Sequence, residues 1–277
     1  FSRFSRKTAG SRTDEQVMAA NFHTVMLVMS LNHDFNLRRL ERYLVMAWDS
    51  GAQPVLVLTK LDACPEPEAM MEQAVAIASG VPVVALSAVT GEGMEKLVPW
   101  LIPGQTLVAL GSSGAGKSTL MNRLAGEELA LTQEVREDDA RGRHTTTHRE
   151  LFLLRSGVLM LDTPGIRELQ LWESDTGLED AFSDIAEISL RCRFRDCTHN
   201  NEPGCAIRMA LQTGELPVAR HENYLKLERE MRFVTQKHSQ ASREAERAFG
   251  KAVTRMQRAN RKNGVRSEER RGGKECI

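Results

Sequence analysis

The nine residues from Gly111 to Thr119, with the sequence GSSGAGKST, constrain the fold of this chain more than any other stretch. They match the phosphate-binding pattern G-x-x-x-x-G-K-[ST] at every fixed position. An apolar run at residues 106–110 precedes them and a helical pattern follows, which is the context that the pattern requires. In such loops backbone N–H groups turn around an anion, and the helix N-terminus adds positive potential. The sequence therefore predicts a binding site for a nucleoside triphosphate.

Two side chains of this loop have expected chemical roles. Lys117 is predicted to reach the β- and γ-phosphates, where its charge would assist catalysis, and the Ser118 hydroxyl is predicted to bind Mg²⁺. The alternative, a glycine-rich turn without a ligand, leaves the filling of all fixed positions unexplained. The other loop residues expected at the nucleotide are Gly111, Ser112, Ser113, Gly114, Ala115, Gly116 and Thr119.

The composition is that of a globular protein with an apolar core. Of the 277 residues 41% are hydrophobic and 27% are charged, and the formal net charge is zero, so nucleic-acid binding would have to come from local basic patches. No apolar run approaches the roughly twenty residues that span a bilayer. The first residues are basic without an apolar segment after them, so we expect no secretory signal; the start without Met suggests a fragment.

Short apolar runs alternate with stretches of helical periodicity before Gly165. This alternation is typical of an α/β fold with an open, mostly parallel sheet and helices on both faces, where ligands bind beyond the carboxyl ends of the strands. A mainly helical region is predicted to follow, at residues 178–190 and 217–262. The predicted strands are 25–29, 55–58, 81–86, 106–110, 150–154 and 158–161, and the predicted helices are 37–47, 70–77 and 94–101.

Polar residues follow two of the predicted strands. An aspartate there, Asp62, can accept hydrogen bonds from N1 and N2 of guanine, a donor pair that adenine lacks, and leaving the carboxylate unpaired disfavours the wrong base. A backbone N–H after the next strand would meet the guanine oxygen. Four polar residues after a strand also occur in ordinary loops, so the combination of both segments carries the prediction. The residues concerned are Thr59, Lys60, Leu61, Asp62, Ser87 and Ala88.

A second cluster has the spacing C-x4-C-x-H-x5-C and consists of Cys192, Cys197, His199 and Cys205. Four thiolate and imidazole ligands suit tetrahedral Zn²⁺ with no open position, which is typical of a structural site. The chain has five cysteines, an odd number, and three of them lie in this cluster. That distribution favours metal binding in a reducing compartment over a disulfide framework, so we expect a cytoplasmic protein.

The motifs stand in permuted order, because base recognition precedes the phosphate loop and Asp162-Thr163-Pro164-Gly165 follows it. With the cysteine cluster and the stretches FNLRR (35–39) and RFRD (193–196), this order resembles the circularly permuted ribosome small-subunit-dependent GTPase A (RsgA) family. The resemblance implies a GTPase that uses GTP and GDP, Mg²⁺ and one structural Zn²⁺, and we expect it to be a monomer. It also implies stimulation by the small ribosomal subunit, contact with its rRNA and a role in late 30S maturation. We expect no membrane among its partners.

The resemblance also implies a division into segments. Residues 1–22 would be a linker or remnant of the family's N-terminal OB-fold, which is otherwise missing, and residues 23–177 the permuted GTPase domain. Residues 178–262 would form the zinc-binding helical domain. The tail at 263–277 does not look like the family's, and we assign it no function.

The segments 141–147 and 162–165 suggest how Mg²⁺ and the γ-phosphate are held. Asp162 would bind Mg²⁺ through water, and the N–H of Gly165 would contact the γ-phosphate. In the stretch 141–147 one threonine should complete the Mg²⁺ shell, and we favour Thr146 over Thr145.

The usual residue for activating water is absent from its motif position. Many GTPases orient the attacking water with a glutamine that follows the Asp-x-x-Gly motif, and Ile166 stands there instead. We hypothesise that His144 takes this catalytic role, because an imidazole suits proton transfer near neutral pH. Alternatively, His144 is an exposed loop residue.

Basic residues mark possible RNA contacts. A stripe at helical spacing in 251–262 and two arginines on the cysteine loop would meet phosphates without sequence preference, although such a stripe also suits a solvated helix face. These residues are Arg193, Arg195, Lys251, Arg255, Arg258 and Lys262.

Two other functions fit parts of this pattern. The first is an ATP-using enzyme with a phosphate loop, which the T-K-L-D segment argues against. The second is a zinc-stabilised RNA-binding module that keeps nucleotide as a structural ligand, which Ile166 leaves open.

Overall fold

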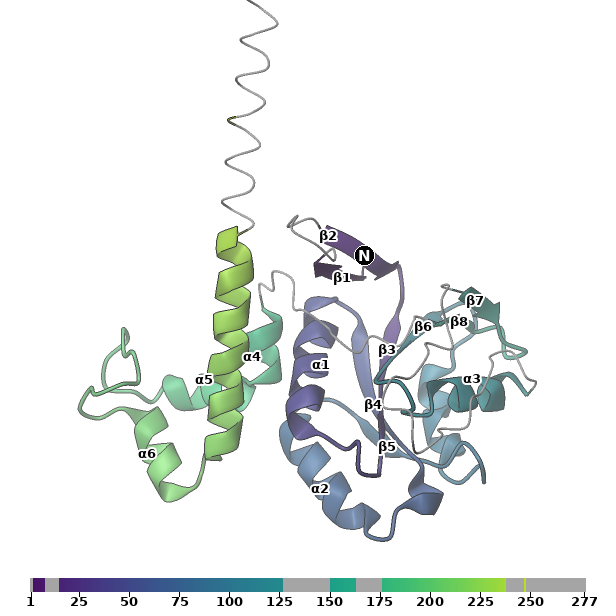
Figure 1. The fold of residues 1–277 in the computed structure, drawn as a ribbon, viewed down its shortest axis with the longest axis horizontal. Coiled ribbons are helices and arrows are strands. Elements are labelled where there is room, and N and C mark those ends of the chain that lie inside the picture. The colour runs from purple at the N-terminus through teal and green to yellow at the C-terminus, as the bar shows by residue number, and fades with distance from the viewer. Residues whose placement is uncertain (1, 8–14, 127–149, 163–175, 238–246, 248–277) are drawn as a thin grey trace, which may run out of the picture.

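The computed structural model describes residues 2–7, 15–126, 150–162, 176–237 and 247. Its centre is a six-stranded sheet with the order β5-β4-β3-β6-β8-β7 (Figure 1). Neighbouring strands are parallel except for β7 and β8 at one edge, so the predicted mostly parallel sheet is confirmed. The strands are β3 (Thr24–Ser30), β4 (Gln53–Thr59), β5 (Val83–Ala85), β6 (Thr106–Leu110), β7 (Glu150–Leu153) and β8 (Leu159–Asp162).

The central strands are buried on both faces, as their unbroken apolar runs predict. Val25 and Leu27 of β3 pack in one core with α1 (Leu37–Asp49) and α2 (Pro67–Ile77). Met26 and Val28 pack in a second core with α3 (Lys117–Ala125) and the 3₁₀ helix η2 (Met94–Trp100). Alternate residues of one strand thus serve opposite faces. Helices cover both faces of the sheet, as expected for this fold class.

Three predicted elements differ in detail from the structure. The strand expected at 81–86 is shorter, Val83–Ala85, and begins after Pro82, which has no N–H to donate to a ladder. The helix expected at 94–101 is a 3₁₀ helix with Pro99 inside it, where an α-helical hydrogen bond would lose its donor. The helix expected at 178–190 is divided into two at Phe182, whose backbone leaves the helical region.

The N-terminal residues form a hairpin against the sheet domain. Strand β1 (Arg3–Lys7) pairs antiparallel with β2 (Glu15–Ala20). Phe4 stacks on Phe22 with ring centroids 4.7 Å apart, and both side chains belong to the α1 core. The backbone N–H of Arg3 donates to the carbonyl of Ser50 at 2.9 Å. These described residues are therefore packed structure; their derivation from an OB-fold stays a prediction.

The C-terminal region is helical in its described part. It contains α4 (Gly177–Ala181), α5 (Ser183–Ser189), α6 (Ala206–Thr213) and a longer helix at 218–237. Figure 1 shows the helix at 218–237 beside α4, on the side of the sheet that α1 covers. Phe182 and Leu227 from this region join the core that contains α1. Among the described residues, no helix is both long and apolar enough to cross a membrane.

A buried ionic cluster joins this region to α1. The Arg220 guanidinium donates to Glu41 of α1 at 2.8 Å and to both carboxylate oxygens of Asp184, at 2.6 and 2.7 Å. The side chains of Arg220 and Glu41 are only 6% and 3% exposed. The amide of Asn223 also donates to Glu41, and the Arg220 guanidinium lies over the ring of Phe182. The helix at 218–237 is therefore fixed to α1 by buried polar contacts.

Candidate nucleotide site and metal centre

The order of the strands along the chain reverses between β3 and β6. The chain runs outward from β3 through β4 to β5 in one direction, and from β6 to β8 in the other. In open parallel sheets, ligands bind beyond the carboxyl ends of the strands where the order reverses in this way. The loops that follow β3, β4 and β6 are residues 31–36, 60–66 and 111–116. All three start at the carboxyl ends of parallel strands, at the same end of the sheet.

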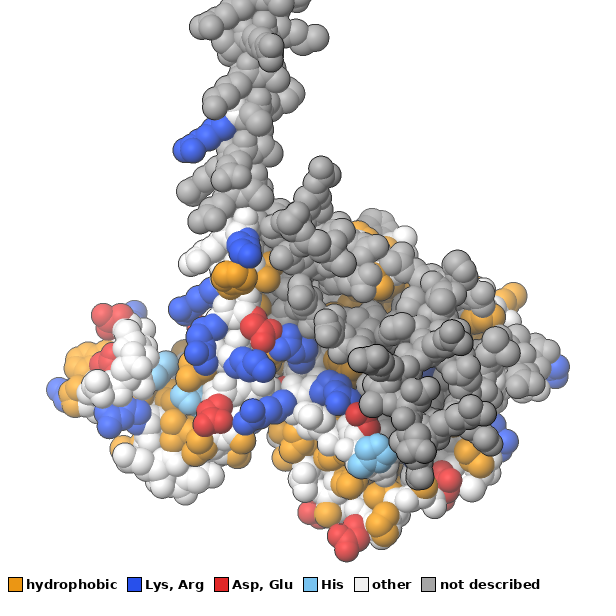
Figure 2. Space-filling view, in the orientation of Figure 1, with side chains coloured by type: hydrophobic (Ala, Val, Ile, Leu, Met, Phe, Trp, Pro, Cys, Tyr) orange, Lys and Arg blue, Asp and Glu red, His pale blue; other side chains and the backbone are white. Residues whose placement is uncertain are grey.

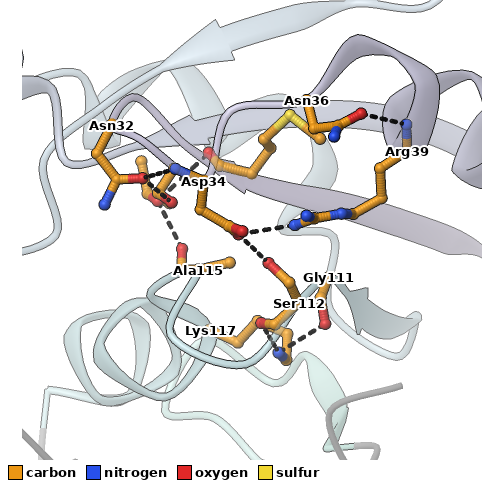
Figure 3. A network of polar contacts seen from close by, with 11 residues as sticks. Asn32, Asp34, Asn36, Arg39, Gly111, Ser112, Ala115 and Lys117 are labelled. Atoms are coloured by element: carbon orange, nitrogen blue, oxygen red, sulfur yellow. Dashed lines mark hydrogen bonds and ion pairs between the residues drawn. The ribbon is translucent and has the colours of Figure 1, made fainter. Parts of the chain in front are cut away.

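The phosphate loop follows β6 as the sequence predicts. A side chain at Gly111 would place its Cβ 2.3 Å from the carbonyl oxygen of Val28 in β3, so only glycine fits there. The Lys117 ammonium donates to the carbonyls of Gly111 and Ser112, at 2.9 and 2.7 Å (Figure 3). Lys117 is only 8% exposed although it is charged. The lysine is thus held along its own loop, at the start of α3.

The predicted base-recognition segment touches the phosphate loop directly. The Thr59 hydroxyl, at the end of β4, donates to the carbonyl of Ala115 at 2.6 Å. Gly116 has a φ of +90°, and a Cβ there would lie 3.2 Å from the Thr59 hydroxyl oxygen, so a side chain would be both strained and crowded. The two segments are 56 residues apart in the sequence. The structure therefore brings together two predicted motifs that the sequence could not place side by side.

The two segments predicted to read the base also meet each other. The N–H of Leu61 donates to the carbonyl of Leu86 at 3.2 Å, directly before Ser87. Lys60 has a φ of +62°, and Asp62 lies exposed in the 3₁₀ helix η1 (Leu61–Ala63) that follows. Ser87 is fully buried, and its hydroxyl accepts from the N–H of Thr90, so this serine shapes its own loop. Contact of Asp62 and Ala88 with guanine stays a prediction.

The loop after β3 contributes residues that the sequence analysis did not assign. The carboxylate of Asp34 accepts from the Ser112 hydroxyl at 2.6 Å and from the Arg39 guanidinium at 2.8 Å (Figure 3). Burial tends to raise the pKa of Asp34, but the hydrogen bonds from Ser112 and Arg39 outweigh it and lower the pKa. The available signal was a polar cluster, Asn32 to Asn36, directly after a buried strand. The sequence pattern alone does not predict its place beside the phosphate loop.

Several predicted site residues lie outside the described part of the chain. The backbone of Asp162 ends β8, one residue beyond the pair Val108–Leu161, and so stands at the same edge as the phosphate loop. Its side chain is not described. Five other candidates for the switch segments and for catalysis lie entirely outside the described residues: His144, Thr145, Thr146, Gly165 and Ile166.

The predicted metal ligands are brought together. One ligand atom from each of Cys192, Cys197, His199 and Cys205 lies within 4.8 Å of all the others. The Nδ1 atom of His199 is 3.6 Å from the sulfur of Cys192 and 3.5 Å from that of Cys205. Bond lengths of about 2.3 Å to sulfur and about 2.0 Å to nitrogen place tetrahedral zinc ligands about 3.6 Å apart. The separations of His199 from these two sulfurs therefore fit tetrahedral zinc.

The hydrogen bonds around the cluster favour a thiolate at Cys192, whereas burial and the thiols of Cys205 and Cys192 raise the pKa of Cys197 to about 11. Burial tends to raise the pKa of Cys192, but the N–H groups of Ala206 and Ile207 and the neighbouring thiols outweigh it, and the pKa is lowered. The carboxylate of Glu202 accepts from the N–H groups of Thr198 and Asn200, at 3.0 Å each, and so holds the backbone on either side of His199. The loop is thus pre-shaped to present its ligands.

Of the predicted RNA contacts, two are described. Arg193 and Arg195 are exposed on the cysteine loop. Figure 2 shows Lys and Arg side chains gathered over the helix at 218–237 and the adjoining face of α1. The stripe of Lys251, Arg255, Arg258 and Lys262 and the tail at 263–277 lie outside the described residues.

Comparison with known proteins agrees with this architecture. A family model described as RsgA GTPase matches residues 2–172. A relative from Listeria monocytogenes serotype 4b (strain F2365), named "Small ribosomal subunit biogenesis GTPase RsgA 2", is 48% identical over 261 residues, which cover 93% of this chain and 75% of the relative. The chain belongs to the RsgA GTPase family. A "Small ribosomal subunit biogenesis GTPase RsgA" from Methanosarcina acetivorans is 47% identical over 233 residues, covering 84% of this chain and 63% of that protein.

Two solved structures share the fold. YjeQ from Thermotoga maritima aligns with a TM-score of 0.59 and 26% identity, over 83% of this chain and 75% of that one. YloQ, described as a circularly permuted GTPase, aligns with a TM-score of 0.53 and 27% identity, over 76% of this chain and 69% of that one. The permuted order of the RsgA motifs, which the sequence predicted, is thereby confirmed.

Proposed function

We propose that this RsgA-family chain binds GTP with Mg²⁺ and hydrolyses it, that the small ribosomal subunit stimulates this turnover, and that the reaction serves late 30S maturation. The observation that supports this most is the hydrogen bond from Thr59 to Ala115, because it joins the base-reading segment to the phosphate loop. The names of the relatives, biogenesis GTPases of the small subunit, support the ribosomal role. We further propose a cytoplasmic monomer.

In this proposal the chain discriminates guanine by a carboxylate. Asp62 accepts from the N1 and N2 donors of guanine, and adenine would leave that carboxylate unpaired. Lys60 lies along the base, and a backbone N–H near Ala88 donates to the guanine oxygen. The hydrogen bond from Thr59 to Ala115 keeps the base-reading segment beside the phosphate loop, so that both can bind one nucleotide.

The phosphates are held by the loop and by Lys117. Its backbone N–H groups and the N-terminus of α3 attract the β-phosphate, and Lys117 stabilises negative charge on the β- and γ-phosphates. Ser118, Thr146 and Asp162 are the proposed Mg²⁺ ligands, and the ion would neutralise charge that develops on the phosphate oxygens. The N–H of Gly165 contacts the γ-phosphate. His144, with Ile166 in the place of a glutamine, orients the attacking water.

The cysteine cluster has a structural part in this proposal. Its four ligands would hold one Zn²⁺ without an open position, so the ion shapes the loop and takes no part in hydrolysis. The exposed arginines of that loop, Arg193 and Arg195, would then be presented to rRNA phosphates. The basic stripe at 251–262 would add contacts of the same kind.

The direct test is phosphate release from GTP with and without purified small ribosomal subunits. We expect slow turnover alone and a large increase with subunits, no comparable turnover of ATP, and loss of activity in Lys117→Ala. His144→Ala should retain nucleotide affinity and lose the stimulated rate. Unchanged stimulated turnover in that variant would remove His144 from the mechanism. No phosphate release even with subunits would favour a zinc-stabilised RNA-binding module that keeps nucleotide as a structural ligand.

A further inference from the structure

The loop between β3 and α1 is organised around two side chains. The carbonyl oxygen of the Asn32 side chain accepts from the Ser30 hydroxyl at 2.9 Å and from the N–H of Asp34 at 3.0 Å. Asn36 caps α1 by accepting from the N–H of Arg39 at 3.0 Å. The backbone on either side of Asp34 is thus fixed, and its carboxylate points at the phosphate loop (Figure 3).

Asp34 is the middle of a continuous chain of contacts that ends at Lys117. One carboxylate oxygen, Oδ2, accepts both from the Arg39 guanidinium at 2.8 Å and from the Ser112 hydroxyl at 2.6 Å. The backbone carbonyl of the same Ser112 accepts from the Lys117 ammonium at 2.7 Å. Ser112 is therefore held on its side chain by the β3–α1 loop while its backbone holds the lysine.

We propose that Asp34 is a positioning residue of the nucleotide site, which fixes Ser112 and through it the ammonium of Lys117. The site lies where the loops after β3 and β6 meet, and those two strands are neighbours in the sheet. A displaced Ser112 would move a carbonyl that the lysine needs. Asp34 itself does not touch the nucleotide in this arrangement. The inference rests on the proposed binding of GTP at the phosphate loop.

The charge of Asp34 makes Arg39 part of the arrangement. A carboxylate beside a site for phosphates would repel them, and like charges in partly buried sites cost more than in water. The Arg39 guanidinium, 2.8 Å away, offsets this charge. Removal of Arg39 alone should therefore weaken nucleotide binding by repulsion, and removal of the Asp34 charge in the same protein should restore part of it.

The test measures affinity for GTP and GDP with a fluorescent nucleotide, together with kcat and KM, in a small set of variants. We expect Asp34→Ala and Ser112→Ala each to lower triphosphate affinity about tenfold, because a hydrogen bond to a charged group is lost. The double variant should be no weaker than the worse single one, since both remove the same contact. Ser112→Thr, which keeps a hydroxyl, should bind more tightly than Ser112→Ala.

The Arg39 variants supply a readout that a merely structural role would not move. Arg39→Met should weaken GTP binding more than GDP binding, because the γ-phosphate adds negative charge, and Arg39→Met/Asp34→Asn should recover affinity. Arg38→Met is the matched control, because the exposed Arg38 pairs at 3.3 Å with Glu222 rather than with the phosphate loop. We expect nucleotide affinity like that of the unchanged protein.

The outcomes separate this inference from the proposed function. If the unchanged protein does not bind GTP, the proposed function itself is wrong. If the unchanged protein binds GTP and both Ser112→Ala and Asp34→Ala bind GTP as tightly as it does, Asp34 does not position the lysine. Should Asp34→Ala fail to fold, the other variants decide. Normal GTP affinity in Ser112→Ala would overturn the inference. So would an Arg39→Met/Asp34→Asn variant that binds GTP no better than Arg39→Met.

Discussion

The hydroxyl of Thr59 donates a 2.6 Å hydrogen bond to the carbonyl of Ala115, and this bond connects the end of β4 to the phosphate loop. Thr59 is only 2% exposed and Ala115 is fully buried, so neither group has water as a substitute partner. An unsatisfied buried carbonyl is costly. The pair therefore ties the segment that we propose to read the base to the one that we propose to hold the phosphates.

Replacing Thr59 with valine keeps the shape of the side chain and removes the hydroxyl. We expect Thr59→Val to lower the free energy of unfolding by about 1–3 kcal/mol, because the Ala115 carbonyl loses its partner. GTP and GDP affinity should fall together. Urea denaturation and nucleotide titration measure the two effects. Thr59→Ser keeps the hydroxyl and should match the unchanged protein in stability and nucleotide affinity. If Thr59→Val also matches it in both, the hydrogen bond is unimportant.

The buried cluster around Arg220 predicts strong destabilisation. Burial raises the pKa of Glu41, although Asn223 and Arg220 oppose this. Arg220→Met would leave this carboxylate without its buried partner, so we expect a loss of about 3–5 kcal/mol in the free energy of unfolding. Arg220→Met/Glu41→Gln should recover part of the loss, because the uncompensated charge is gone.

The control for this cluster is an exposed pair of the same type. Arg191 and Glu215 form an ion pair in which both side chains are more than half exposed, 57% and 51%. Arg191→Met should cost at most about 1 kcal/mol. Equal losses in Arg191→Met and Arg220→Met would contradict the importance of the buried contacts between α1 and the helix at 218–237.

The metal centre predicts one zinc ion per chain. Colorimetric zinc release should find one equivalent in the purified protein and none in Cys205→Ser, which removes a buried ligand. Cys64→Ser is the matched control, since Cys64 contacts Met70 and lies outside the cluster. Chelation should remove hydrogen-exchange protection from residues 190–213, because a small region with such a site depends on its ion. Zinc retained in Cys205→Ser would contradict the assignment.

Asp34 predicts a specific pH dependence of stability. Its pKa in the folded protein lies below the reference value of 3.8, so the ionised carboxylate stabilises the fold above that pH. This contribution disappears as the pH falls through the lower folded value. The difference in the free energy of unfolding between the unchanged protein and Asp34→Asn should therefore shrink in acid. Urea denaturation of both proteins measures it, and a difference independent of pH would contradict the ion pair.

The sequence predicted the elements whose signals are local. The phosphate loop, the parallel sheet and the metal ligands follow from fixed spacings and apolar periodicity, and the structure places them as expected. The division at Phe182 was not predicted, because the apolar spacing continues through it and only tertiary contacts with Arg220 and Tyr224 explain its position.

The contacts between distant segments could not be predicted in the same way. The hydrogen bond from Ser112 to Asp34 spans 78 residues, and the one from Arg220 to Glu41 spans 179. No pattern in one sequence assigns such partners. A carboxylate after a buried strand indicated a place at the edge of the sheet, but the order of the strands was needed to identify its neighbour.

The most direct test of the whole account is the base preference of Asp62→Asn. In this variant an amide N–H replaces a carboxylate oxygen, so the partner of N2 becomes a donor, which suits the second carbonyl of xanthine instead of the amino group of guanine. We predict that the unchanged protein prefers GTP over both XTP and ATP, and that Asp62→Asn loses GTP affinity and gains XTP affinity in the same pocket, with Lys117→Ala abolishing both. Retention of tight GTP binding by Asp62→Asn would contradict the claim that Asp62 reads the base beside the phosphate loop.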